Sequence, residues 1–153
     1  MTIKKAIDFS LTDKDGKKHS LTEIKSDYIV LYFYPKDNTP GCTLEANSFN
    51  RDLEKFKRLK TTVIGISGGD EKSKTTFCEK NKLSILLLSD TDFSISKKYG
   101  VYGEKSFMGH KYLGISRTTF ILDKTRKIIN VYEKVNPITH SKEILEFLSM
   151  RGG

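Results

Sequence analysis

The sequence predicts an α/β protein in which helices flank a central mixed β-sheet that begins with an N-terminal β-hairpin. Three observations carry this prediction: short, strongly apolar runs, helical apolar spacing between them, and two strand-like runs around a polar turn near the C-terminal end. Buried strands that alternate with helices are typical of a parallel sheet covered on both faces. The 153 residues show no internal repeat and no flexible linker, so we expect one domain over residues 1–153.

The N-terminal third predicts a hairpin and then a central strand. Residues 9–21 contain two short strand-like runs, and Asp15-Gly16 between them is a favoured turn pair. Residues 28–34 form an unbroken run of β-branched and aromatic side chains, as expected for a strand buried on both faces. We assign these aromatic residues to the core, and Pro35 ends the strand.

The middle of the chain alternates helices with strands. Residues 44–59 place apolar side chains at roughly helical spacing, and residues 62–67 form a second buried strand. A helix follows, with Asp70 as its expected N-cap. Residues 86–88 form a third strand, and a short helix then ends before Gly100.

The C-terminal part predicts an antiparallel hairpin and a last helix. Residues 117–122 and 127–132 are two strands around a polar turn, and residues 141–150 form the helix. This hairpin adds antiparallel strands at one side of the sheet. The whole order of elements suits a thioredoxin-like fold, which by itself does not settle the function.

The composition excludes some classes of partner. The net charge is +8, but the lysines are scattered along the chain and acidic residues stand among them, which favours a solvated surface over a nucleic-acid site. No apolar run approaches the roughly 20 residues that cross a bilayer, and no apolar signal core follows the basic N-terminus. We therefore expect a cytoplasmic protein without nucleic-acid or membrane partners.

The chain has two cysteines, Cys42 and Cys78, and their separation limits their chemistry. The 36-residue spacing excludes the CxxC pair of a disulfide reductase or isomerase and excludes a zinc knuckle. A permanent structural disulfide is not expected in a reducing cytoplasm. Two interpretations stay open, namely ordinary buried thiols or a redox pair. His19, His110 and His140 stand in three separate segments, so we interpret them as surface or structural residues and expect no metal site.

The stretch around Cys42 leaves a buried strand, crosses a loop and enters a helix. In the first turn of a helix, free backbone N–H groups and the dipole favour an anion such as a thiolate. Thr39 brings a hydroxyl that can both donate to and accept from a hydroperoxide. Pro35 can shield the sulfur without adding a donor, and Arg117 can supply a fixed cation. Taken singly, these three residues would be a loop cap, a strand terminator and a surface arginine.

Together, these residues resemble the peroxiredoxin active site, Pro-x-x-x-Thr-x-x-Cys with a distant arginine. The resemblance runs from about Phe9 to Leu148 and is to the peroxiredoxin Q branch, also called bacterioferritin comigratory protein. The stretches that carry it are Tyr32 to Thr43, Val63 to Ser67, Leu88 to Asp90 and Gly103 to Gly109.

The resemblance implies a reaction and a role for each residue. Cys42 would reduce hydrogen peroxide or organic hydroperoxides and become a sulfenic acid. Thr39, Arg117 and the backbone N–H groups near Gly41 and Cys42 would orient the peroxide, and Pro35 would shield the sulfur. The resemblance also implies a monomer that needs no cofactor.

The sequence departs from the pattern of the branch at one position. Many members carry a second cysteine five residues after the first, where this chain has Asn47. Cys78 resembles a second arrangement in the same branch, so we hypothesise that it forms an intramolecular disulfide with Cys42 that thioredoxin reduces. The alternatives are a one-cysteine peroxidase that uses an external thiol and, in a different class, a basic binding or holdase protein without turnover.

Overall fold

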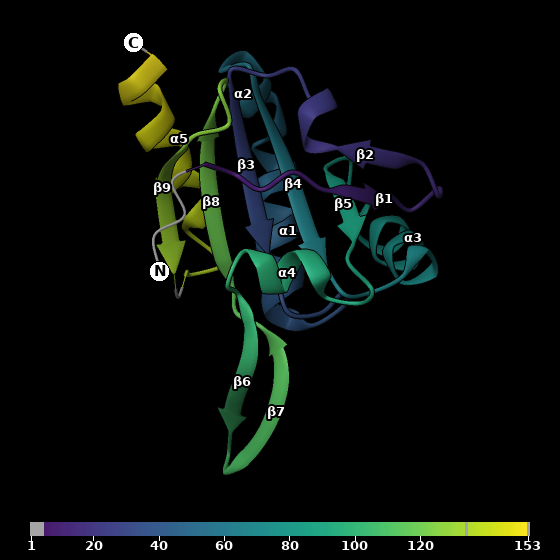
Figure 1. Cartoon of the computed structure of the whole chain (residues 1–153). Helices are drawn as coiled ribbons and strands as arrows, with labels where there is room; N and C mark the ends of the chain where they lie inside the picture. The colour runs from purple at the N-terminus through teal and green to yellow at the C-terminus, as the bar shows by residue number, and fades with distance from the viewer. Residues whose placement is uncertain (1–4, 134, 153) are drawn as a thin grey trace.

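A computed structural model describes residues 5–133 and 135–152 and has the predicted α/β architecture, with a central mixed sheet flanked by helices (Figure 1). Seven strands form this sheet in the order β2-β1-β5-β4-β3-β8-β9. The central strands β3, β4 and β5 are parallel, whereas the pairs β1–β2, β1–β5, β3–β8 and β8–β9 are antiparallel. The strand bounds are Ser10–Thr12 (β1), Lys18–Ser20 (β2), Tyr28–Phe33 (β3), Thr61–Ser67 (β4), Leu86–Ser89 (β5), Thr118–Asp123 (β8) and Ile128–Glu133 (β9).

Helices cover both faces of the sheet and form two apolar cores. One core lies between the sheet and α1, α2, α3 and α5, and the other lies under α4 and the N-terminal segment. Because both faces are covered, the side chains from Ile29 to Phe33 in β3 are at most 1% exposed, as the unbroken apolar run predicted. The helix bounds are Pro40–Arg51 (α1), Leu53–Arg58 (α2), Glu71–Asn81 (α3), Ser94–Lys98 (α4) and His140–Gly152 (α5), with a 3-10 helix at Leu21–Glu23.

The structure confirms the predicted turns and helix cap. Gly16 has a φ of +80° in the turn between β1 and β2, and Gly100 has a φ of +74° after α4. The carboxylate of Asp70 accepts a hydrogen bond from the backbone N–H of Ser73 at 2.9 Å and caps α3. Within the described ranges, no helix is both long enough and apolar enough to cross a membrane.

The single helix predicted over residues 44–59 is wrong, because the segment forms two helices. Helix α1 begins earlier, at Pro40, and Asp52 separates it from α2. The Asp52 carboxylate is buried and accepts a hydrogen bond from Ser141 Oγ of α5 at 2.8 Å, which ties this break to the body of the protein. Leu44 is 48% exposed, because the buried face of α1 consists of Cys42, Glu45, Ala46, Ser48 and Phe49.

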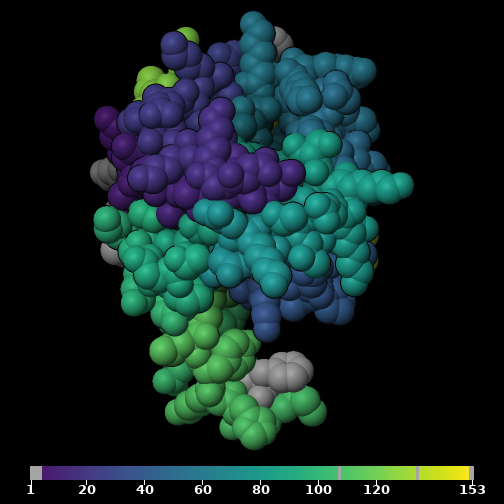
Figure 2. All heavy atoms as spheres, turned by 90° about the vertical axis from the view of Figure 1, so that its right-hand side faces the viewer, coloured from purple at the N-terminus to yellow at the C-terminus, as the bar shows by residue number. Residues whose placement is uncertain are grey.

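A third hairpin, absent from the sequence prediction, projects from the body. Strands β6 (Tyr102–Phe107) and β7 (His110–Ile115) pair with each other. Figure 1 shows this hairpin beyond the ends of β3 and β4, and Figure 2 shows the same segment, in green, projecting below the rest of the molecule. Its turn residues have positive φ, 50° at Met108 and 81° at Gly109, which is typical of a two-residue hairpin turn. The described side chains of the hairpin, except Ile115, are exposed or half-buried, so the sequence lacks the apolar alternation that signals a half-buried strand.

Candidate active site

Cys42 lies in the first turn of α1, as predicted. Thr39 is the N-cap residue with an extended backbone, and its carbonyl accepts a hydrogen bond from the N–H of Thr43 at 2.9 Å. Pro40 fits the first helical position because the backbone there needs no N–H donor. Cys42 is 1% exposed, so its sulfur lies inside the protein near the positive end of the α1 dipole.

Arg117 contacts Cys42 although 75 residues separate them in the chain. It precedes β8, which begins at Thr118, so the strand predicted from Arg117 starts one residue later. Thr118 pairs with Phe33, and this register brings Arg117 to the end of β3, beside the start of α1. The Nη2 atom of Arg117 then donates to Cys42 Sγ at 3.4 Å.

Gly41 gives the Arg117 guanidinium its room. A Cβ atom at this position would lie 3.0 Å from Nη2 of Arg117, closer than real Cβ atoms usually approach a neighbour. Glycine therefore lets the guanidinium reach the backbone of the first turn of α1. The structure thus brings three of the predicted site residues together, namely Cys42, Gly41 and Arg117.

Glu45 is a site residue that the sequence analysis missed. Its Oε1 atom accepts a hydrogen bond from Nη1 of Arg117 at 2.8 Å, and its side chain is 0% exposed. Its position three residues after Cys42 places both side chains on one face of α1, and that spacing could have revealed it. The guanidinium therefore bridges a thiol and a carboxyl group.

The pKa values of this group reflect burial and pairing. Burial raises the pKa of Glu45 to about 7, and the charge of Arg117 lowers it only in part. Burial alone would lower the pKa of Arg117, but Cys42 and Glu45 together outweigh that effect and raise it. Arg117 is therefore a fixed cation, whereas Glu45 can gain or lose a proton near neutral pH.

The Glu45 pKa predicts that stability falls as pH rises from about 4.5 through 7. The folded protein holds the Glu45 proton up to pH of about 7, whereas the unfolded chain releases it near its ordinary pKa of about 4.5. Above pH 7, the ionisation of Glu45 should therefore make the free energy of unfolding about 3 kcal/mol lower than it is below pH 4.5. Urea denaturation of the wild type and of Glu45→Gln at pH 5 and pH 8 measures the difference. An equal pH dependence in the two proteins would contradict the assignment.

Thr39 and Pro35 lie in the loop that joins β3 to α1. The Thr39 hydroxyl donates to the carbonyl of Lys36 at 2.9 Å and makes no capping bond to α1. Asn38 has a φ of 63°, so the loop turns sharply just before the helix. Pro35 is half-buried two residues after the end of β3. Both residues therefore belong to the segment that leads directly to Cys42.

Cys78 lies on α3, on the same side of the sheet as Cys42. Both cysteines are free thiols, and both belong to the apolar core beneath α1, α3 and α5. Cys78 is 5% exposed, and burial raises the pKa of its thiol, which the nearby Lys14 charge partly opposes. Cys78 also lines a hollow of about 200 Å³ beside the turn that joins β1 and β2.

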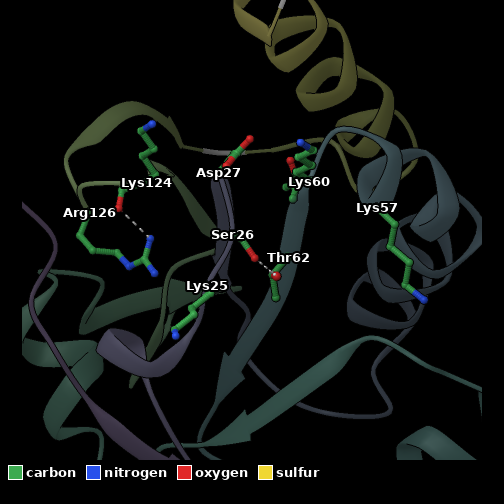
Figure 3. Close-up of a pocket in the computed structure, with 9 residues that line it drawn as sticks. Lys25, Ser26, Asp27, Lys57, Lys60, Thr62, Lys124 and Arg126 are labelled. Atoms are coloured by element: carbon green, nitrogen blue, oxygen red, sulfur yellow. Dashed lines mark hydrogen bonds between the residues drawn. The ribbon is translucent and has the colours of Figure 1, made fainter.

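The lysines that appear scattered in the sequence are gathered in part by the fold. Three separate segments line a hollow of about 640 Å³ at the start of β3 and β4, the opposite end of these strands from Cys42 (Figure 3). Asp27 is the acidic residue in its lining. Lysines that lie far apart in the sequence meet here because strand pairing joins distant segments. The cations are Lys25, Lys57, Lys60, Lys124 and Arg126.

The site is a cysteine in the first turn of a helix that accepts a hydrogen bond from an arginine at the end of a thioredoxin-like sheet. This arrangement defines the class of thiol-dependent peroxidases. Comparison with known proteins agrees with this class. Residues 3–131 match the model of the AhpC/TSA family. Peroxiredoxin Bcp of Escherichia coli strain K12 is 39% identical over 140 residues, which cover 92% of this chain and 90% of that protein. The chain belongs to the AhpC/TSA family and is a peroxiredoxin of the Q, or Bcp, branch.

Solved structures of this branch share the fold. The bacterioferritin comigratory protein of Xanthomonas campestris, described for its alkyl peroxide reduction activity, superposes with a TM-score of 0.88 at 31% identity, covering 95% of this chain and 92% of that one. Two structures of peroxiredoxin Q from the same organism each carry serine in place of one cysteine, at a different position in each. They superpose with TM-scores of 0.88 and 0.87 at 32% identity, covering 94–95% of this chain and 91–92% of that one. Those two positions are 36 residues apart.

Proposed function

We propose that Cys42 is the residue that reduces the peroxide. The observation that carries this assignment is the contact of its sulfur with Arg117 at the start of α1, because a cation and a helix N-terminus both favour a thiolate. The thiolate attacks the terminal oxygen of R–O–O–H, so that an S–O bond forms and the O–O bond breaks. The leaving R–O⁻ takes a proton and departs as water or an alcohol, and Cys42 becomes a sulfenic acid.

Four further residues have supporting roles in this proposal. Arg117 stabilises the charge that develops on the peroxide oxygens, and Gly41 lets the guanidinium come close. Thr39 supplies a hydroxyl that can exchange its bond to Lys36 for one to the peroxide. Pro35 shields the sulfur and adds no competing donor. Support for these roles comes from their place in the loop and strand ends around Cys42.

We assign the resolving role to Cys78. Its thiol attacks the sulfenic acid, an S–S bond forms and water leaves. The 36-residue separation of Cys42 and Cys78 equals that of the two cysteines replaced in the Xanthomonas campestris structures, which supports the pairing. A disulfide needs Cα atoms within about 7 Å, so the first turn of α1 would unwind to let the two helix-borne sulfurs meet. Gly41 favours that opening, because glycine is a weak helix former.

The substitution Cys78→Ser tests the resolving role. We expect the first oxidation of Cys42 to keep its rate, whereas turnover supported by thioredoxin and its reductase falls at least about 10-fold, because the sulfenic acid loses the nearby thiol that forms the intramolecular disulfide. Non-reducing mass mapping of the peroxide-treated wild type should find the Cys42–Cys78 disulfide. Undiminished turnover in Cys78→Ser, or an oxidised wild type free of this disulfide, would favour the one-cysteine mechanism with an external thiol.

The wider reaction follows from the same chemistry. The substrates in this proposal are hydrogen peroxide and organic hydroperoxides, and a dithiol protein of the thioredoxin kind reduces the disulfide. The alkyl peroxide activity named for the Xanthomonas campestris relative supports the organic substrates. We further propose a single-domain monomer in the cytoplasm, where a reducing environment returns both thiols. Sedimentation of the reduced protein tests the monomer.

The experiment that tests the function as a whole is steady-state consumption of hydrogen peroxide with thioredoxin and thioredoxin reductase. We expect turnover by the wild type and none by Cys42→Ser. Consumption at the same rate by both proteins would overturn the assignment of Cys42. Salt-dependent binding of nucleic acid without peroxide turnover would instead indicate a basic binding protein.

A further inference from the structure

A buried ion pair lies beside the loop that carries Pro35 and Thr39, and the steps proposed above do not use it. Asp37 is in the middle of this loop, and Lys74 is in the first turn of α3. Lys74 Nζ donates to Asp37 Oδ2 at 2.9 Å, and the two side chains are 0% and 1% exposed. Two opposite charges are thus held together inside the protein, next to the candidate active site.

Lys74 has an acceptor for each hydrogen of its ammonium group. Besides Asp37, Nζ donates to the Ser67 hydroxyl at 2.5 Å and to the Gly69 carbonyl at 3.2 Å. Ser67 ends β4, and Gly69 lies in the segment between β4 and α3. An ammonium group has three donors, so this site satisfies it completely. The cation therefore joins the loop, the end of β4 and the start of α3.

The Asp37 carboxylate also accepts several hydrogen bonds. It accepts from the Tyr34 hydroxyl at 2.5 Å and from Ser73 Oγ at 2.7 Å, in addition to Lys74. Gly69 makes room for it, because a Cβ there would lie 2.2 Å from Oδ2 of Asp37. A residue without a side chain thus stands where the carboxylate must fit.

A contribution to stability does not explain why this ion pair is buried. Burial lowers the pKa of Lys74, and the charge of Asp37 only partly offsets that cost. Buried ion pairs often contribute no more stability than apolar residues of the same size would. What the pair does provide is a fixed geometry, because charged hydrogen bonds constrain distance and direction.

The geometry that the pair fixes is that of the loop before Cys42. Within residues 35–39, which the structure describes in full, the Asp37 side chain forms hydrogen bonds to α3. The Thr39 hydroxyl instead forms its hydrogen bond within the loop, to the carbonyl of Lys36. Asn38 follows Asp37 directly with a φ of 63°, a conformation that needs support from its surroundings. Thr39 and the first turn of α1 come next in the chain, so their positions depend on where Asp37 is held.

We propose that Asp37 and Lys74 are positioning residues for peroxide reduction. Their ion pair holds the loop against β4 and α3, and thereby sets the place of the Thr39 hydroxyl and the first-turn N–H groups relative to the Cys42 sulfur. The inference rests on the proposed function, because it takes Cys42 as the residue that reacts with peroxide. Neither side chain touches the peroxide in this scheme.

The test compares Lys74→Met with the double variant Asp37→Asn/Lys74→Met, each in a Cys78→Ser background where Cys42 is the sole thiol. The single variant leaves a buried charge unpaired and can fail to fold, whereas the double variant removes both charges. For the folded protein, we expect the single-turnover rate constant of Cys42 with hydrogen peroxide to fall about 10- to 100-fold, as for a small misplacement of reacting groups.

A second measurement separates positioning from a general loss of structure. Alkylation of Cys42 by iodoacetamide needs the reactive sulfur but not an aligned O–O bond, so its rate should stay close to that of the background protein. A folded double variant with an unchanged peroxide rate would overturn the inference. An equal fall of the peroxide and alkylation rates would overturn it as well.

Asp52→Asn is the matched control. It also alters a buried carboxylate that accepts a hydrogen bond from a hydroxyl group, but this carboxylate lies at the end of α1 that is far from Cys42. We expect a lower unfolding midpoint and an unchanged peroxide rate. The same loss of peroxide rate in this variant would show that destabilisation alone explains the result. A wild-type peroxide rate in Cys42→Ser would instead defeat the proposed function itself, whatever the Lys74 variants do.

Discussion

Cys42→Ser should lose peroxide reduction down to the background rate, a fall of at least about 10³-fold relative to the wild type. The reason is chemical, because a serine hydroxyl stays protonated at neutral pH and cannot take an oxygen atom from the peroxide, as a cysteine thiolate does when it becomes a sulfenic acid. The fold should survive, since serine has nearly the same shape as cysteine in a site that is 1% exposed. Stopped-flow peroxide consumption without any reductant measures the first turnover directly.

The control for this experiment is the other buried cysteine. Cys78→Ser makes the same atomic change on α3 and should still take up one oxygen atom per chain, as measured by the mass of the intact protein. If Cys42→Ser consumed peroxide while Cys78→Ser did not, the roles of the two thiols would have to be exchanged. Circular dichroism of both variants verifies that they are folded.

Arg117→Met should slow the reaction of Cys42 with peroxide by about 10²- to 10³-fold, the usual loss when one fixed donor to a developing negative charge is removed. In the wild type, the guanidinium lies 3.4 Å from the Cys42 sulfur and 2.8 Å from Glu45. Arg117→Lys should recover only a small part of the rate, because an ammonium group lacks the fork that reaches both acceptors. The second-order rate constant with hydrogen peroxide is the quantity to compare.

Two companion variants make the Arg117 result interpretable. Arg117→Met/Glu45→Gln avoids an unpaired buried carboxylate, so it should recover stability without recovering the rate. Arg51→Met removes an arginine that also bonds a carboxylate, that of Asp52 at 3.2 Å, but is 56% exposed and outside the site. It should react with peroxide like the wild type. Equal rates for Arg51→Met and Arg117→Met would contradict the proposed role of Arg117.

Local patterns in the sequence predicted most of the fold. Strands β3, β4 and β5 at the centre of the sheet are mostly apolar because both faces are covered, and such runs of residues are visible without any tertiary knowledge. The helix caps and turns were equally local, as with Asp70 and Gly16. The β6–β7 hairpin was missed because it projects into solvent and the side chains of β7 from His110 to Leu113 are exposed, which removes the alternation that marks a strand.

The break between α1 and α2 was missed for a different reason. Apolar spacing continues from Phe49 through Leu53 and Phe56, so the period alone predicts one helix. Asp52 interrupts it while its carboxylate is bonded to Ser141, a residue 89 positions further along the chain. An interaction over such a separation depends on how the helices pack and leaves no local signal.

The sequence by itself determined that Cys42 starts a helix after a buried strand and has Pro35 and Thr39 before it, because these are relations between neighbours in the chain. It also singled out Arg117, because this residue opens a predicted strand and because the peroxiredoxin active site that the sequence resembles includes a distant arginine. Only the tertiary structure decided what surrounds the sulfur: the register of β3 with β8 brings Arg117 to Cys42, and Arg117 in turn bridges to Glu45. The buried contact of Asp37 with Lys74 was likewise decided by packing, since charges 37 positions apart meet only when β4 and α3 close over the loop.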